Sequence, residues 1–290
     1  MADQPALRIG LRTGLALTVA SIGGVVMFCW PLFLQVDPAT NGHVTDAPLL
    51  FILVLPVLVA IVLAQFAEGG MDAKALAMLG VLSAVNAALR PLGAGLAGVE
   101  TVFFLLVIAG RVFGPGFGFV LGCTSLFASA LITAGVGPWL PFQMMASAWI
   151  GLGAGLLPRR VSGRVEVAML VAYAVVVSYG FGFAMNLWSW PFALGGGTDL
   201  SFVPGDPVAA NLQRFTVYVL STSTWGWDTG RAITNTLLIL LLGPALLATF
   251  RRASRRASFG SATTFAAPVR EPRKPVAPSA SPAPRSTHTR

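Results

Sequence analysis

The chain has 290 residues, of which 55% are hydrophobic and only 10% are charged, and its formal net charge is +8. A soluble domain carries roughly 25% charged residues, so this composition excludes a soluble globular fold. The apolar runs lack the polar–apolar alternation of barrel strands, which excludes a transmembrane barrel. The sequence therefore predicts an all-α polytopic membrane protein.

The apolar runs predict eight membrane-spanning helices. Several runs reach about 20 residues, which is the length needed to cross a hydrocarbon core about 30 Å thick. In chain order we expect spans at 11–34, 48–66, 74–90, 99–112, 116–136, 141–157, 165–188 and 230–250. The first run is too long for the apolar region of a signal peptide, so we interpret it as a retained span.

Basic residues in the short loops predict the orientation, because Lys and Arg concentrate on the cytoplasmic side. They precede the first span and follow the second, fourth, sixth and eighth. These residues are Arg8, Arg12, Lys74, Arg111, Arg159, Arg160, Arg164, Arg251, Arg252, Arg255 and Arg256. Since successive spans alternate in direction, all of them fall on one side. We therefore expect both termini to be cytoplasmic.

The C-terminal tail accounts for the whole net charge. Residues 251–290 contain nine basic side chains and one acidic side chain, so 9 − 1 = +8, and residues 1–250 sum to zero. The tail is rich in Pro, Ser, Ala and Arg, a composition typical of disorder. Its charge suits either a positive-inside retention signal or contact with anionic lipid headgroups.

Small residues at four-residue spacing indicate close helix packing, because lipid gives helices no hydrophobic reason to associate. The predicted packing glycines are Gly114, Gly118, Gly122, Gly151 and Gly155. Ala84 and Ala88 have the same spacing in the third span. They predict either internal packing or a flat docking surface for another membrane subunit.

Polar residues inside spans are costly and are therefore functional candidates. Here they lie toward the predicted outer side, together with most of the tryptophans. The candidate substrate-binding residues are Asn86, Arg90, Trp139, Gln143, Asn186, Trp190, Trp227, Asp228, Arg231 and Asn235. Two interpretations stay open, namely local pairing such as Asp228 with Arg231, and convergence on a ligand in an outward-facing pocket. The long outer connection at 190–228 is interpreted as a lid, with a short amphipathic helix at 211–220.

Catalytic and nucleotide-binding motifs are weak in this sequence. Residues 93–98 match GxGxxG, but no strand precedes them, so we interpret the match as chance. The sequence has no Walker A motif and only two histidines, His43 and His288. We expect no catalytic residues, no metal and no cofactor, and any uphill transport would need a partner or an ion gradient.

Four segments carry a family resemblance: AVNAALRPLG, GRVFGPGFGFVLG, GVGPWLPFQMMASAWIGLGAGLLPRR and WDTGRAITN. They resemble the substrate-binding (S) components of energy-coupling factor (ECF) transporters, which are prokaryotic vitamin uptake systems. The resemblance implies a six-helix ECF S-component-like core at 71–250, with a site near the extracellular surface. Two extra N-terminal transmembrane helices at 1–70 and a disordered basic cytoplasmic tail at 251–290 lie outside it.

The resemblance also implies partners, namely a coupling transmembrane subunit and two cytoplasmic ATPase subunits, with Ala84 and Ala88 at the docking surface. It makes binding of a vitamin-like small molecule the leading hypothesis, with tryptophan rings stacking on the ligand. An integral membrane enzyme, such as a lipid-modifying transferase, would have to use Glu100 and Asp228 as its acids. A stand-alone ion-coupled carrier would transport without ATPase subunits.

Overall fold

The computed structural model describes residues 9–33, 73–93, 98–194 and 197–258, together with positions 56, 60 and 64. Every regular element in these ranges is helical. Among these described residues, five segments are long and apolar enough to cross a membrane: Leu11–Phe28, Ala73–Gly93, Pro115–Ile132, Gly163–Ala193 and Val208–Arg256. The chain is therefore a polytopic all-helical membrane protein, as predicted. Apart from positions 56, 60 and 64, the expected span at 48–66 lies outside the described residues.

The centre of the bundle is formed by α5 (Phe103–Phe113), α6 (Pro115–Ile132) and α7 (Leu140–Leu156), which pack on one another. All 11 residues of α5 are buried. At 1.5 Å per residue, α5 is only about 16 Å long, which is much less than the thickness of the hydrocarbon core. The longer helices around it therefore enclose α5 and shield it from lipid.

The predicted glycine packing is confirmed at the contact between α6 and α7. A Cβ added to Gly118 would strike the carbonyl oxygen of Gly151, and one added to Gly151 would strike the carbonyl oxygen of Gly118. A Cβ on Gly122 would lie 2.5 Å from backbone atoms of Ser147 and Ala148. The two helix backbones therefore touch directly, which only glycine permits at these positions.

Gly114 has a different role from the other predicted packing glycines. It is the single residue between α5 and α6, and its φ of 97° lies in the region that favours glycine. Pro115 follows as the first residue of α6, where its missing N–H costs nothing. This Gly-Pro pair reverses the chain between two helices that then pack side by side.

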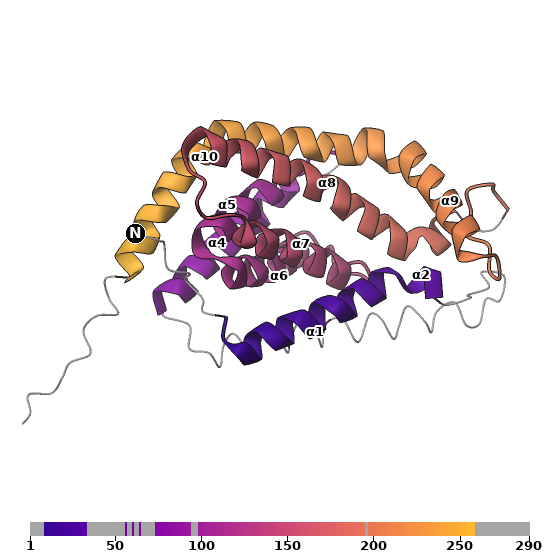
Figure 1. Ribbon diagram of the computed structural model, residues 1–290, viewed down its shortest axis with the longest axis horizontal. Helices are drawn as coiled ribbons and strands as arrows, with labels where there is room; N and C mark the ends of the chain where they lie inside the picture. The colour runs from indigo at the N-terminus through magenta and orange to yellow at the C-terminus, as the bar shows by residue number, and fades with distance from the viewer. Residues whose placement is uncertain are drawn as a thin grey trace, which may run out of the picture.

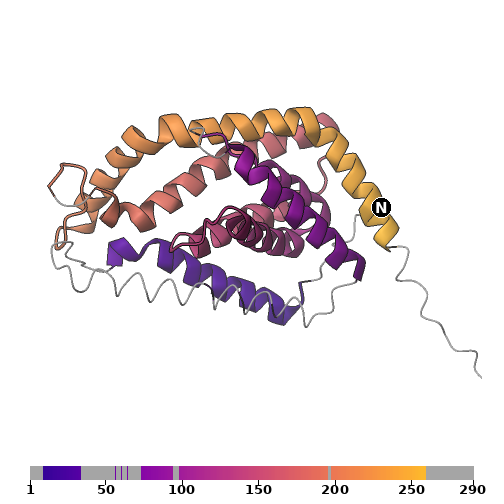
Figure 2. The ribbon, with the colours of Figure 1, turned by 180° about the vertical axis from the view of Figure 1, so that it is seen from behind.

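Two long helical segments extend beyond this centre. One is α8 (Gly163–Ala193), and the other joins α9 (Val208–Val219), the π-helical segment η2 (Leu220–Asp228) and α10 (Thr229–Ser258). Figure 1 shows α8 and α10 side by side along the top of the view, and Figure 2 shows the same pairing from behind. The 31 residues of α8 span about 46 Å, so one end of α8 projects past the hydrocarbon core.

A second, smaller hydrophobic cluster occupies that projecting end. Its buried members are Leu187, Trp190, Phe202, Phe215, Tyr218 and Val219. The rings of Trp190 and Phe215 lie 5.4 Å apart, centroid to centroid. This cluster fixes the end of α8 against α9 and so holds η2 in place.

The prediction of a long outer connection at 190–228 was wrong. α8 continues to Ala193, and α9 and η2 occupy 208–228, so the described non-helical residues of this stretch are 194 and 197–207. The amphipathic helix predicted at 211–220 is confirmed as α9. However, it runs on through η2 into α10 and is not a separate lid. The predicted boundary of the disordered tail at residue 251 was also wrong, because α10 is helical to Ser258.

The first predicted span is confirmed as α1 (Leu11–Phe28), which is followed by the short α2 (Trp30–Phe33). α1 packs on α7 and α8. The indole N–H of Trp149 on α7 donates to Ser21 Oγ at 3.1 Å, and Phe28 packs edge-on against Phe142. α1 therefore lies against the outside of the α7–α8 pair, across the bottom of the view in Figure 1.

The alternating helices separate two groups of charged residues. Arg111, Glu166 and Arg251 meet at one end of the bundle, which we call the arginine end. Arg90, at the far end of α4 (Ala73–Leu89), and Arg231, near the start of α10, lie at the opposite end, which we call the pocket end. This separation is the one that the loop charges predicted. Which end faces the cytoplasm stays a prediction.

Candidate functional site

Two neighbouring pockets open at the pocket end. The first has a volume of about 270 Å³ and lies between the short 3₁₀ helix η1 (Arg90–Gly93), the segment 98–100 and the η2–α10 junction. Its walls are Arg90, Pro91, Gly93, Gly98, Val99, Glu100, Thr133, Trp227 and Arg231. The second has a volume of about 330 Å³ and shares Trp227 and Arg231 with the first. Its other walls include Asn186, Tyr218 and Ser223.

Trp227 is carried by η2, whose wider π-helical turns often occur at functional sites. Threonine hydroxyls satisfy carbonyl groups five residues earlier in this segment. Thr224 Oγ1 donates to Val219 O at 3.1 Å, and Thr229 Oγ1 donates to Thr224 O at 2.6 Å. Trp227 is 51% exposed, so one large ring stands at the wall of both pockets.

Gly98 brings the segment 98–100 onto η2. Its φ is 75°, and a Cβ there would lie 2.5 Å from the carbonyl oxygen of Gly226 and 2.8 Å from Gly230 Cα. Gly93, the last residue of η1, has no room for a Cβ because it would strike the carbonyl oxygen of Val99. These two glycines therefore allow the segment 98–100 to lie against both η1 and η2, which sets the position of Glu100.

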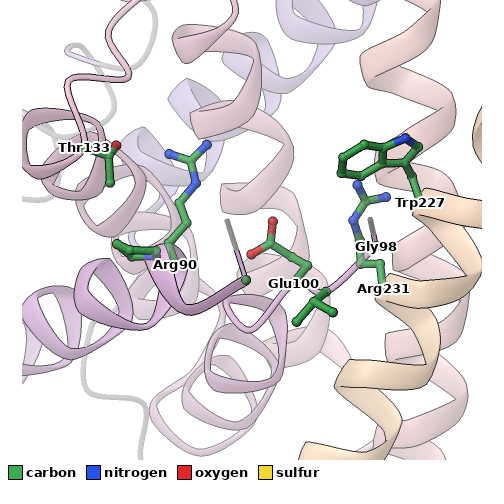
Figure 3. A pocket seen from close by; sticks show the side chains of 9 residues that line it. Arg90, Gly98, Glu100, Thr133, Trp227 and Arg231 are labelled. Carbon is green, nitrogen blue, oxygen red and sulfur yellow. The ribbon is translucent and has the colours of Figure 1, made fainter. Parts of the chain in front are cut away.

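Glu100 is the acidic group of the first pocket. Figure 3 shows it between Arg90 on one side and Arg231 with Trp227 on the other. Burial raises the pKa of Glu100 above its ordinary value, while Arg231, Arg90 and the backbone N–H groups of Val102 and Thr101 act to lower it. The negative charge is thus partly desolvated, and a ligand that donates an N–H group to the carboxylate would stabilise it.

Arg231 is held in place by several partners. Its Nη1 donates to Asp228 Oδ1 at 2.7 Å and to Ser178 O at 3.2 Å. The guanidinium lies 5.0 Å from the ring centroid of Phe181, a cation–π distance. Asp228 is only 1% exposed and also accepts a hydrogen bond from Ser223 Oγ at 3.1 Å. The predicted local pairing of Asp228 with Arg231 is therefore confirmed, and it fixes the arginine at the wall of both pockets.

Arg90, Gln143 and Asn186 are also tied to their surroundings. Arg90 Nη2 donates to Gln143 Oε1 at 2.7 Å, which joins the end of α4 to the first turn of α7. Asn186 Nδ2 donates to Gly182 O at 2.7 Å and to Ser223 Oγ at 3.0 Å. Arg90 lines the first pocket and Asn186 lines the second. The structure therefore brings both polar side chains to the region that the sequence indicated.

Asn235 lies behind the first pocket and positions one of its walls. Its Nδ2 donates to Glu100 O at 2.9 Å, and its Oδ1 accepts a hydrogen bond from the backbone N–H of Phe104 at 2.7 Å. Asn235 thereby satisfies one of the free N–H groups at the start of α5 and anchors the backbone of Glu100. Its role as a ligand contact stays a prediction.

Gln143, Asp228 and Asn235 line neither pocket, and neither do the three remaining predicted contact residues. Asn86 is fully buried and donates to Ser125 Oγ at 3.0 Å, between α4 and α6. Trp190 is fully buried, and its indole N–H donates to Leu200 O at 2.9 Å. Trp139 is 42% exposed and bonds to the carbonyl of Gly135 at 3.2 Å. These contacts give Asn86 and Trp190 a structural role, and they leave their predicted contact with a ligand untested.

Sequence reasoning missed Gly93, Gly98 and Thr133 as parts of the site. The available signal was the GxGxxG match at 93–98, whose first and last glycines are the two that shape the pocket. The match lacks the preceding strand that nucleotide-binding loops need, because the 3₁₀ helix η1 precedes it. Gly93 and Gly98 are nevertheless required by the structure, because the backbone at each lies too close to neighbouring backbone atoms to admit a Cβ.

The predicted docking residues Ala84 and Ala88 are both exposed on α4. Among the described residues, no group of three or more His, Cys, Asp or Glu side chains is placed to hold a metal ion. No protein-family model matches the chain, and no curated protein or solved structure is detectably similar to it.

Proposed function

We propose that the protein is the substrate-specificity subunit of an ATP-driven ECF-type importer and binds a vitamin or related small molecule at the extracellular side. One observation carries this proposal: Arg90, Glu100 and Arg231 surround a pocket whose wall includes the half-exposed ring of Trp227. Pockets with one ring surface and a few fixed polar groups are typical of small-molecule sites. This pocket lies at the end of the bundle remote from the arginine end, where the loop charges predict the outside.

The chemistry of the walls indicates the kind of ligand. A flat ring would stack on Trp227, Arg90 and Arg231 would donate to ring or carbonyl oxygens, and Glu100 would accept from a ring N–H or amine group. The arginines and carboxylates nearly balance in charge, which favours a neutral or zwitterionic heterocycle over a strongly charged one. Both oxygens of Asp228 are already engaged by Ser223 and Arg231, which favours a positioning role over catalysis.

Equilibrium binding to the purified protein tests this proposal. A panel of vitamins and precursors would be titrated, beginning with any small molecule that mass spectrometry finds co-purified. Trp227→Ala should weaken binding about tenfold, because it removes both ring stacking and buried area. Trp225→Ala is the matched control, since Trp225 is 79% exposed and lines neither pocket. Binding that is absent in the folded protein, or equally weakened by both variants, would refute the proposal.

The proposal includes partners, because the sequence has no Walker A motif of its own. A coupling transmembrane subunit, which carries two cytoplasmic ATPase subunits, would dock on the exposed small side chains of Ala84 and Ala88. Ala84→Phe should abolish ATP-dependent uptake and leave ligand affinity unchanged. Val176→Phe, on the exposed side of α8, should affect neither. Uptake by vesicles that lack ATPase subunits would instead support a stand-alone carrier.

A further inference from the structure

A groove lies at the arginine end, remote from the two pockets described above. Its volume is about 590 Å³, and its walls come from the first turns of α8 and the last turns of α10. Val167 on α8 and Leu240 and Leu247 on α10 form apolar walls, and Arg164, Glu166 and Arg251 form a polar mouth. None of these residues takes part in the proposed ligand site.

The polar and apolar parts of this groove follow one another along α10. Arg251 is at the mouth and Leu240 is at the deep end, 11 residues earlier in the helix. At 1.5 Å per residue the groove therefore runs about 16 Å along α10, close to half of a hydrocarbon core about 30 Å thick. A groove of this depth, charged at one end and apolar along its length, has the dimensions of one lipid leaflet.

The mouth carries an excess of positive charge. Glu166 is 1% exposed, and its Oε1 accepts from Arg111 Nε and from Arg251 Nη2, each at 2.6 Å. Among the described residues that line the groove, Arg164 and Arg251 are the cations and Glu166 is the anion, so 2 − 1 = +1. Arg164 is exposed and forms no ion pair within the described parts of the chain. The charged mouth of the groove therefore favours the binding of an anionic group.

We propose that this groove binds one anionic phospholipid from the adjoining leaflet. The phosphate lies at Arg164 and Arg251, and one acyl chain follows Leu240 and Leu247. A zwitterionic lipid would bring its own cation to a mouth that is already positive. The chain's own residues 259–290 suit this groove poorly, because they contain five basic residues and one acidic residue. Charge and shape together thus favour an anionic lipid.

Native mass spectrometry of the delipidated full-length protein tests this proposal, with dioleoyl phosphatidylglycerol and dioleoyl phosphatidylcholine as probes. We expect one phosphatidylglycerol to be retained in preference to phosphatidylcholine. Arg164→Gln should reduce that preference about fivefold, which is the effect of losing one basic residue near a headgroup, about 1 kcal/mol. Arg160→Gln is the matched control, since it makes the same charge change at an exposed residue outside the groove walls.

A second variant tests the apolar part of the groove. Ala168 is an exposed residue of the groove wall, and Ala168→Phe should reduce retention of both lipids by filling the space of the acyl chain. Equal effects of Arg164→Gln and Arg160→Gln, or unchanged retention in Ala168→Phe, would overturn the proposal. A loss of preference in Arg273→Gln/Lys274→Gln, with none in Arg164→Gln, would assign the lipid to the tail instead.

Discussion

Replacing a glycine by alanine should destabilise the protein at the contact between α6 and α7. The same substitution at an exposed glycine of α8 should stabilise it. In Gly122→Ala, the new Cβ would lie 2.5 Å from backbone atoms of Ser147 and Ala148. Ordinary contact begins at 3.4 Å, so the helices would have to separate locally by 3.4 − 2.5 = 0.9 Å. Backbone atoms cannot rotate out of the way as a side chain can, so the whole contact must open.

The cost follows from how far the helices must move. A radial gap of 0.5–1 Å loses about a quarter to a half of the dispersion energy of each affected contact. Overpacking costs about 1–3 kcal/mol, and we expect the upper part of that range here. At about 2–4 °C per kcal/mol, the melting temperature of Gly122→Ala should fall by about 6–12 °C.

Gly180→Ala is the matched control for this prediction. Gly180 is an exposed residue of α8, and a Cβ there would meet nothing within 4 Å. Replacing glycine by alanine inside a helix should stabilise it by about 0.5–1 kcal/mol. Thermal unfolding in detergent, followed by circular dichroism, measures both variants. If Gly122→Ala were as stable as Gly180→Ala, direct backbone contact between α6 and α7 would be refuted.

Three further predictions concern the two ends of the bundle. Glu166→Gln should lower the free energy of unfolding by about 3–5 kcal/mol, because Arg111 keeps a buried charge. Asp206→Asn, in a half-exposed ion pair, should lower it by less than about 1 kcal/mol. Chemical unfolding measures both variants. Gly98→Ala should weaken ligand binding in calorimetry, whereas Gly197→Ala, with φ of 100° but open space, should leave affinity unchanged. Because burial raises the pKa of Glu100 in the folded state, the stability it contributes is lost as pH rises from about 4.5 through that raised pKa. In thermal unfolding from pH 4 to 7, the melting temperature of Glu100→Gln should therefore increase relative to that of the natural protein as the pH rises.

Much of the helical layout could be predicted from the sequence, because a membrane requires long apolar runs and nothing else in the chain resembles them. The span expected at 74–90 is α4 at Ala73–Leu89, and the one expected at 165–188 lies within α8. From the sequence, the polar segment 220–228 is expected to belong to the long connection at 190–228. Threonine hydroxyls bonded to its own carbonyls, and the cluster around Trp190, keep it helical instead.

The candidate site could be predicted only in part. Arg90, Asn186 and Arg231 were predicted as site residues because polar side chains inside apolar runs are energetically costly and are often functional. Sequence could not show that Gly98 lies against Gly226, since that contact joins residues more than a hundred positions apart. Nor could it tell the exposed ring of Trp227 from the buried ring of Trp190, since hydropathy is the same for both.

Because η2 and α10 are continuous, one helical segment joins the pocket end to the arginine end. Arg231 and Arg251 belong to the same helix, 20 residues or about 30 Å apart. Arg231 lines the two pockets at the pocket end, and Arg251 holds Glu166 at the base of α8. Pro244, between them, removes one backbone hydrogen bond and provides a point of bending. η2 and the ion pairs of Glu166 are therefore connected by one helical segment, with Pro244 between them.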